Sequence, residues 1–260
     1  MDVIELSDDD CPPTEAMRLP ALPTVVLTTP VVAPPLWSVG GPASRLLVPV
    51  EEATSRSEFG LVSKRWVDGG LRREGIRSVH RIQNGHLYST YVTYRAALAA
   101  AARRREHAGV KAEPTGAASE GGDDAELANE DALWHGADVG AIRTIIQQGF
   151  DMRVSNQSGA LGAGNYFAWS AAYSLAYSNM GKHSLGGSSS GLPELAVAQD
   201  ERVMLLARVA LGRPGPSNAQ CRVPVFGFDS AAQGPICCVF DNAACYPEYV
   251  VVFRPAEAKP

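Results

Sequence analysis

Two short stretches near the middle of the chain combine residue types that could bind a flat, amide-bearing ring. The first is Leu133-Trp134-His135-Gly136, and the second is Gly162-Ala163-Gly164-Asn165-Tyr166-Phe167-Ala168, with Ser174 and Tyr177 shortly after it. The main chain at Gly136 can pair with a carboxamide, Ser174 can add a hydroxyl, and two tyrosine rings can enclose a planar ring. Such groups would hold the nicotinamide end of NAD while its bond to ribose breaks.

The chemistry of that bond sets what a site must provide. Nicotinamide leaves a cationic ring as a neutral molecule, so the reaction needs little acid catalysis. The difficulty lies in orienting NAD and in stabilising the oxocarbenium-like ribose that forms, much as in glycoside hydrolysis. The site must therefore fix the carboxamide, clamp the ring and position the ribose hydroxyls.

The helices and strands that position these residues can be predicted from the spacing of apolar residues and from helix-capping residues. Residues 132–136 are predicted to be a strand end, and residues 165–168 a strand reached through a glycine turn. Asp138 is expected to cap a helix that closes at Gly149, and Ser170 to cap the short helix that carries Ser174 and Tyr177 on one face. The helix after Asp138 is expected to bury three isoleucines: Ile142, Ile145 and Ile146.

Elsewhere the pattern predicts long helices early and non-adjacent strands late, which is typical of an α+β fold. Ser57 is expected to cap a helix with an apolar face of Phe59, Val62 and Trp66, and a second helix is expected from Leu87 through Leu98. Loops are expected at 106–126 and 181–193. Strands are expected at residues 46–48, 76–82, 203–211, 236–240 and 249–253.

Composition excludes several classes of protein. The chain has 260 residues, 45% of them apolar and 20% charged, which suits one sizeable soluble domain plus a tail. A formal net charge of −5 argues against tight nucleic-acid binding. The longest apolar runs are too short for a membrane span, and the acidic N-terminus does not resemble a secretory signal. Five cysteines without a Cys-x-x-Cys pair argue against a disulfide framework and a metal site, so we expect an intracellular protein, nuclear or cytoplasmic.

In these motifs the chain resembles the catalytic domain of the diphtheria-toxin-like ADP-ribosyltransferases, the PARP family. The upstream context Asn129-Glu130 and the spacing of Tyr166, Ser174 and Tyr177 carry the resemblance, which covers about residues 45–255. It implies two packed, mostly antiparallel sheets with flanking helices, and NAD as substrate in the cleft between them. We therefore expect a catalytic domain over residues 45–256, preceded by a disordered proline-rich tail over residues 1–44.

The resemblance also implies a role for each residue of the motifs. His135 would hydrogen-bond a ribose hydroxyl, and Gly136 would pair with the carboxamide through its main chain. Tyr166 would pack against the nicotinamide ring and its ribose. Ser174 would add a hydroxyl to the carboxamide, and Tyr177 would stack on the ring. Arg153, with Asn156, would belong to the loop that covers NAD.

The third catalytic position decides the reaction. Alignment of Tyr246-Pro247-Glu248-Tyr249 with the last strands of the family places Ile236 where polymerising members carry glutamate. Isoleucine can neither hydrogen-bond a ribose nor activate a hydroxyl. The resulting triad of His135, Tyr166 and Ile236 implies a mono-ADP-ribosyltransferase that modifies acceptor proteins. Glu248 could be proposed as a replacement base, but its place in a family-typical segment favours a structural role.

Gly162 and Gly164 also suggest a dinucleotide-fold fingerprint. That interpretation fails, because Phe167 stands where the motif needs Gly or Ala and the expected strand–turn–helix with a later acidic residue is absent. Two other interpretations stay open. The chain could be a catalytically weak NAD-binding scaffold. It could also transfer ADP-ribose to a nucleic-acid end or a small molecule.

The N-terminal segment resembles a SUMO-interacting motif. Val3, Ile4 and Leu6 could fill an apolar groove as an added β-strand, while the following acids meet basic residues of SUMO. Phosphorylation of Ser7 would strengthen the acidic part. SUMO is therefore a candidate partner, alongside acceptor proteins, whereas neither nucleic acid nor a membrane is required.

Overall fold

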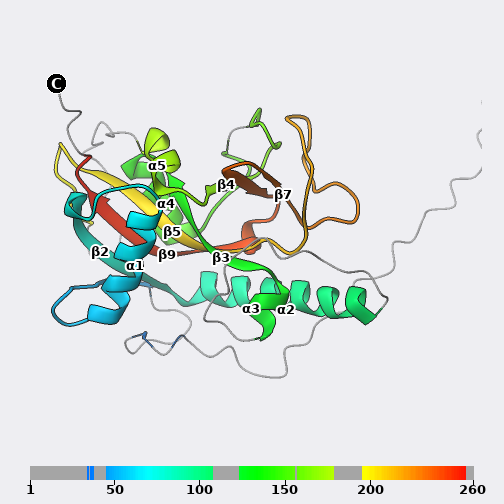
Figure 1. Cartoon of the computed structure of the whole chain (residues 1–260), viewed down its shortest axis with the longest axis horizontal. Helices are drawn as coiled ribbons and strands as arrows, with labels where there is room; N and C mark the ends of the chain where they lie inside the picture. Colours follow the sequence, from blue (N-terminus) through cyan, green and yellow to red (C-terminus); the bar gives the residue numbers. More distant parts are fainter. Residues whose placement is uncertain are drawn as a thin grey trace, which may run out of the picture. The chain divides into compact units, whose positions relative to one another are not determined.

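One hydrogen-bonded sheet joins the nine strands of the computed structural model, which describes residues 34, 36–37, 45–107, 123–155, 157–178 and 195–255 (Figure 1). The strand order is β1-β2-β9-β5-β3-β4-β8-β7-β6, and every neighbouring pair is antiparallel except β6 with β7. The strands are β1 (Arg45–Pro49), β2 (Ile76–Asn84), β3 (Glu130–Gly136), β4 (Asn165–Ala168), β5 (Arg202–Ala210), β6 (Pro214–Gly215), β7 (Ser230–Gln233), β8 (Ile236–Val239) and β9 (Cys245–Phe253).

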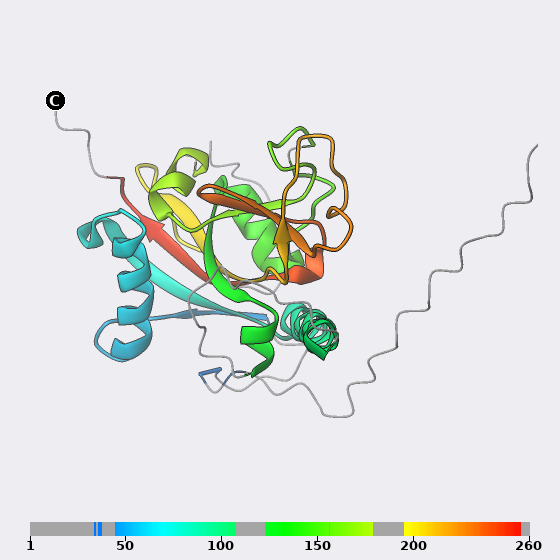
Figure 2. The ribbon, with the colours of Figure 1, turned by 45° about the vertical axis from the view of Figure 1, so that its right-hand side comes forward.

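Helices pack on both faces of this sheet and beside its end. The α-helices are α1 (Arg56–Asp68), α2 (Gly85–His107), α3 (Asp123–Leu127), α4 (Val139–Gln148) and α5 (Ala171–Ser174). The 3₁₀ turns are η2 (Arg73–Gly75), η3 (Leu175–Tyr177) and η4 (Asn242–Ala244). Figures 1 and 2 both show α3 lying against α2, where Arg103 forms an ion pair with Asp124. The expected α+β class is confirmed.

The core has two layers, one on each face of the central strands. Along β5, Val203 and Leu205 enter one apolar cluster, whereas Met204 and Leu206 enter the other. Helix α4 packs into the first cluster, and helices α1 and α5 pack into the second. Because β5 is covered on both faces, its sequence is a nearly continuous apolar run, as expected of a buried strand.

The expected division into two packed sheets is not confirmed. Strand β3 pairs with β5 from Glu130 to Gly136, but it pairs with β4 only at Trp134 and Ala168. This single pair is enough to join the two halves of the sheet into one hydrogen-bonded order. The expected motif strands are confirmed as β3 and β4.

Local capping signals were read correctly around the motifs. The Asp138 carboxylate accepts the Ala141 N–H at 2.9 Å, and α4 closes at Gly149, whose φ is +86°. The Ser170 hydroxyl accepts the Tyr173 N–H at 3.3 Å at the start of α5. These caps fix the helices that flank β3 and β4.

Two boundaries were predicted wrongly. Ser57 lies inside α1, which begins at Arg56 after Ser55, and Ser55 makes no side-chain cap. The expected burial of Val62 and Trp66 on this helix is confirmed. The loop expected at 106–126 is too long at both ends, because α2 continues to His107 and α3 spans Asp123–Leu127. Alanine, leucine and glutamate favour a helix, and aspartates in the first turn of α3 suit the helix dipole, so these preferences outweigh the turn-like composition.

The candidate SUMO-interacting residues Val3, Ile4 and Leu6 lie outside the described residues, as does most of the proline-rich tail. Among the helices that the structure describes, none is both long and apolar enough to cross a bilayer.

Candidate functional site

The predicted site lies where the ladder between β3 and β4 opens. The Trp134–Ala168 pair sets an antiparallel register that would next oppose His135 to Phe167 and Gly136 to Tyr166, but neither pair forms. Instead, His135 Nδ1 lies 2.8 Å from the carbonyl oxygen of Tyr166. A side chain thus takes the place of the backbone partner, and it links the first motif directly to the second.

The imidazole of His135 is neutral, with one ring nitrogen that donates and one that can accept a hydrogen bond. Burial lowers its pKa, and the hydrogen bond to Tyr166 opposes this only in part, so the ring is uncharged at neutral pH. Phe150 packs edge-on against the ring, with the centroids 5.2 Å apart, and Phe167 lies 5.6 Å away. Because a carbonyl can only accept, Nδ1 carries the proton and Nε2 keeps a lone pair. That nitrogen can accept a hydrogen bond from a ribose hydroxyl.

Gly136 is required by the packing of its own chain. A Cβ at this position would overlap the carbonyl oxygen of Ser174 and come within 3.1 Å of the Ser178 nitrogen. The sequence suggested close approach of a substrate, whereas the structure shows close approach of the segment after β4. The Ser174 hydroxyl donates to the Trp134 carbonyl at 3.2 Å, so Ser174 and the end of β3 lie together as predicted.

Tyr177 follows Ser174 but has a different environment. Helix α5 ends at Ser174, which is buried, and the chain continues as the 3₁₀ turn η3, which leaves Tyr177 55% exposed. Its ring lies 5.9 Å from that of Tyr173, with 34° between the planes. An exposed aromatic face beside a buried hydroxyl suits a residue that stacks on a bound ring.

The hydroxyl of Tyr166 forms hydrogen bonds within the protein, which fix the position of the ring. The hydroxyl accepts the Leu161 N–H at 2.8 Å and donates to the Gly162 carbonyl at 2.7 Å. Burial raises the pKa of Tyr166 to about 12, so the phenol is neutral. The ring lies over Gly159, where any side chain would overlap it. Gly159 was missed by the sequence analysis, although a glycine just before a predicted glycine turn was an available signal.

Ile236 lies on the same face of the sheet as Tyr166. Strand β8 pairs Ile236 with Ala168 and Cys238 with Tyr166, and paired residues share a face. Ile236 and Tyr166 both pack against one apolar cluster: Leu161, Ala231, Cys238 and Phe240. No carboxylate is therefore supplied at position 236 beside the site tyrosine.

Arg153 lies in the turn after α4 and bonds to Asp151. Its Nη2 lies 2.7 Å from Asp151 Oδ2 and its Nε lies 2.9 Å from Oδ1. This pairing lowers the pKa of Asp151 to about 2. The Arg153 side chain is 84% exposed, and its side-chain hydrogen bonds go to Asp151 rather than to the residues described above. Asn156 lies outside the described residues.

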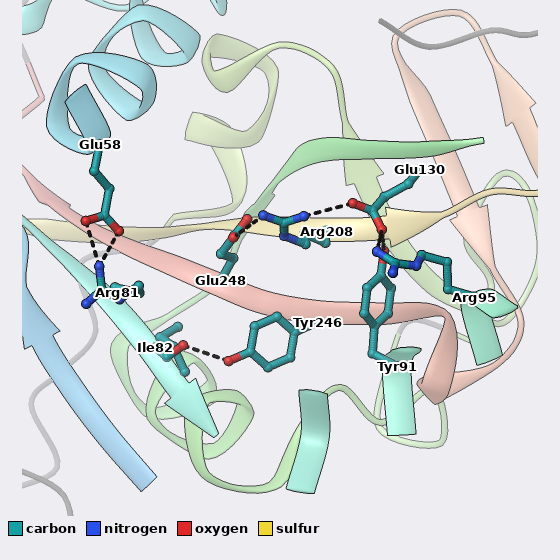
Figure 3. Close-up of polar contacts among 9 residues, drawn as sticks. All are labelled: Glu58, Arg81, Ile82, Tyr91, Arg95, Glu130, Arg208, Tyr246 and Glu248. Atoms are coloured by element: carbon teal, nitrogen blue, oxygen red, sulfur yellow. Dashed lines mark hydrogen bonds and ion pairs between the residues drawn. The ribbon is translucent and has the colours of Figure 1, made fainter. Parts of the chain in front are cut away.

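A buried charge network accounts for Glu248 (Figure 3). Arg208 bonds Glu248 at 2.6 Å and Glu130 at 3.0 Å, and Glu130 also accepts from Arg95 at 2.8 Å and from the Tyr91 hydroxyl at 2.6 Å. Burial opposes ionisation of Glu130, but the arginines outweigh it and its pKa is lowered. The network joins α2, β3, β5 and β9, and within it the Glu248 carboxylate is engaged by Arg208.

Residues 75–217 match the family model of the Poly(ADP-ribose) polymerase catalytic domain, which is more than half of the chain. The chain belongs to this family. PARP catalytic domains use NAD as their substrate. The matched range contains His135, Gly136, Tyr166, Ser174 and Tyr177, whereas Ile236 lies beyond it.

A curated relative points to the same family. The Protein mono-ADP-ribosyltransferase PARP12 of Mus musculus is 32% identical over 147 residues, which are 51% of this chain and 18% of the relative. The chain therefore matches less than a fifth of the length of that PARP protein. In the part that the structure describes, no group of three His, Cys, Asp or Glu side chains could hold a metal ion.

Proposed function

We propose that this PARP domain transfers a single ADP-ribose unit from NAD to side chains of acceptor proteins and releases nicotinamide. The observation that carries the proposal is the isoleucine on β8 that shares a face with the site tyrosine. An aliphatic side chain cannot orient or deprotonate a hydroxyl of bound ADP-ribose. Without such a group, a second unit is not added. The name of the related mouse protein agrees with this branch.

The residues divide the binding of NAD among them. The main chain at Gly136 holds the carboxamide, and the Ser174 oxygen, whose hydrogen is donated to the Trp134 carbonyl, accepts from the carboxamide N–H. The rings of Tyr166 and Tyr177 enclose nicotinamide. The neutral His135 accepts a hydrogen bond from a ribose hydroxyl through Nε2. Each contact orients the ribose, so the barrier falls through positioning rather than through acid catalysis.

The transfer step needs no base from the enzyme when the acceptor is a carboxylate. The bond between the ribose C1′ and the nicotinamide nitrogen breaks, and its electron pair leaves with neutral nicotinamide. The carboxylate of the acceptor stabilises the oxocarbenium ion and then forms the new bond to C1′. Because the acceptor carboxylate is consumed, the enzyme has no group left to extend the product.

The test is incubation of the purified chain with labelled NAD, beside a His135→Ala variant, followed by denaturing gel electrophoresis. We expect a discrete labelled band that is lost in the variant. A high-molecular-mass smear would contradict mono-transfer. An unlabelled wild-type protein that still binds NAD by calorimetry would instead support the scaffold interpretation. Label on phosphorylated nucleic-acid ends alone would support the nucleic-acid alternative.

We also propose that the N-terminal segment binds SUMO as an added β-strand through Val3, Ile4 and Leu6. The proposal is supported by the apolar residues, which are followed after Ser7 by Asp8-Asp9-Asp10. Calorimetry with purified SUMO should show binding to the full chain that is lost when Ile4 and Leu6 are replaced by alanine. Equal binding by the variant would refute it.

A further inference from the structure

The hydroxyl of Tyr166 is not free to serve the substrate as a donor. A phenol has one O–H, and this one is given to the Gly162 carbonyl at 2.7 Å. The oxygen also accepts the Leu161 N–H at 2.8 Å. What Tyr166 offers a ligand is therefore its ring, and the turn that holds the hydroxyl sets where that ring lies.

That turn is held in place by a distant segment of the chain. The Ser217 hydroxyl donates to the Leu161 carbonyl at 2.7 Å, and the Ala163 N–H donates to the Cys221 carbonyl at 2.9 Å. At Gly162, whose φ is +105°, a Cβ would overlap the Cys221 carbonyl. Figures 1 and 2 both show the loop after β6 standing beside the loop that leads into β4.

The contacts converge on two successive peptide planes. In the plane between Leu161 and Gly162, the carbonyl is held by Ser217 and the N–H bonds to the Gly159 carbonyl at 2.9 Å. In the next plane, between Gly162 and Ala163, the carbonyl is held by Tyr166 and the N–H by Cys221. The rigid plane held by Ser217 lies between the Leu161 N–H and the Gly162 carbonyl, the two groups that bond the Tyr166 hydroxyl, so a rotation of this plane displaces both of them.

We propose that Ser217 is a positioning residue for NAD, which acts by fixing Leu161 and through it the ring of Tyr166. Leu161 is fully buried in the folded protein, so its carbonyl depends on the hydroxyl of the half-buried Ser217 for a hydrogen bond. An unsatisfied buried carbonyl is costly, and the plane turns to find another partner. This inference rests on the proposed function of the site, because it assigns the tyrosine ring to NAD.

The test compares Ser217→Ala with a matched control, Ser230→Ala. The Ser230 hydroxyl donates to the Leu211 carbonyl, also at 2.7 Å, and Leu211 is fully buried as well. That bond makes no contact with the turn around Tyr166. Ser230 is fully buried whereas Ser217 is half-buried, so Ser230→Ala should lose at least as much stability against urea. A larger effect of Ser217→Ala on the turn around Tyr166 is therefore assigned to positioning.

The first readout needs no NAD: the hydrogen-exchange rate of the Leu161 amide, which the Tyr166 hydroxyl protects. We expect Ser217→Ala to raise this rate several-fold while amides of β5 exchange as in the control. We expect KM for NAD to rise about 3- to 10-fold with kcat nearly unchanged, since one net hydrogen bond is at stake. Ser217→Thr should restore both values.

Wild-type exchange of Leu161 together with wild-type KM in Ser217→Ala would overturn the inference. So would an equal rise in exchange at Leu161 and at β5 amides, because that would show general destabilisation. Failure of the proposed function is a separate result, in which the wild-type protein neither binds nor cleaves NAD. The exchange readout still tests the contact between Ser217 and the Tyr166 turn in that case.

Discussion

Replacement of Gly136 by alanine should weaken nicotinamide binding, because the added methyl group displaces the main chain of the segment from Ser174 to Ser178. The added Cβ would overlap the Ser174 carbonyl oxygen and lie 3.1 Å from both the Ser174 carbonyl carbon and the Ser178 nitrogen. These neighbours are main-chain atoms, so they cannot swing aside, and the segment from Ser174 to Ser178 must move as a unit. Overpacking of this kind costs about 1–3 kcal/mol. If the displacement is transmitted to the carboxamide contacts, affinity falls about 5- to 150-fold.

The assay is calorimetric titration with nicotinamide, together with thermal unfolding of each protein. Gly60→Ala is the matched control, because Gly60 lies in α1 and a Cβ there meets nothing within 4 Å. The control should bind nicotinamide as the wild type does and unfold at a slightly higher temperature, since alanine favours a helix by about 0.5–1 kcal/mol over glycine. Wild-type affinity and stability in Gly136→Ala would refute the reasoning.

Three further predictions concern charge and hydrogen bonding. Glu130→Gln should lower the free energy of unfolding in urea by on the order of 3–5 kcal/mol, because Arg95 and Arg208 lose a buried counter-charge. The control Glu52→Gln, in the exposed pair with Arg73, should lower it by at most about 1 kcal/mol. Equal losses in the two variants would contradict this prediction. Tyr166→Phe should cost about 1–3 kcal/mol, since Leu161 and Gly162 lose their partner, and unchanged urea unfolding would argue against the observed contacts. Burial lowers the pKa of His135 in the folded state, so the unfolded state binds the proton first and stability falls as pH drops below about 6.5. His135→Gln should flatten this fall in urea midpoints between pH 8 and 5, and an identical pH slope in both proteins would show that His135 does not contribute.

The sequence predicted those parts of the fold that depend on neighbouring residues. The caps at Asp138 and Ser170 each bond an N–H three residues later, so the local sequence was enough to locate them. Strand β5 is covered on both faces, and its unbroken apolar run was therefore recognisable. Ser57 failed as a cap because the helix already begins at Arg56, and Ser55 makes no side-chain cap that would mark the boundary.

The contacts that shape the site could not be predicted from local patterns. The bond from Ser217 to Leu161 joins segments far apart in the chain, and only the assembled sheet brings them together. The opening of the ladder after Trp134 depends on strand register, which no single strand specifies. Arg153 is an exception, because its partner Asp151 lies only two residues away and the pair was accessible to a local prediction.

The central claim is that the enzyme stops after one unit, and the most direct measurement is the mass added to a modified protein. Wild-type protein is incubated with excess NAD, and the intact modified chain and its peptides are measured by mass spectrometry. We expect each modified site to carry the mass of a single ADP-ribose, whatever the incubation time. Sites that carry two or more linked units would contradict it, and would show that Ile236 does not limit the reaction.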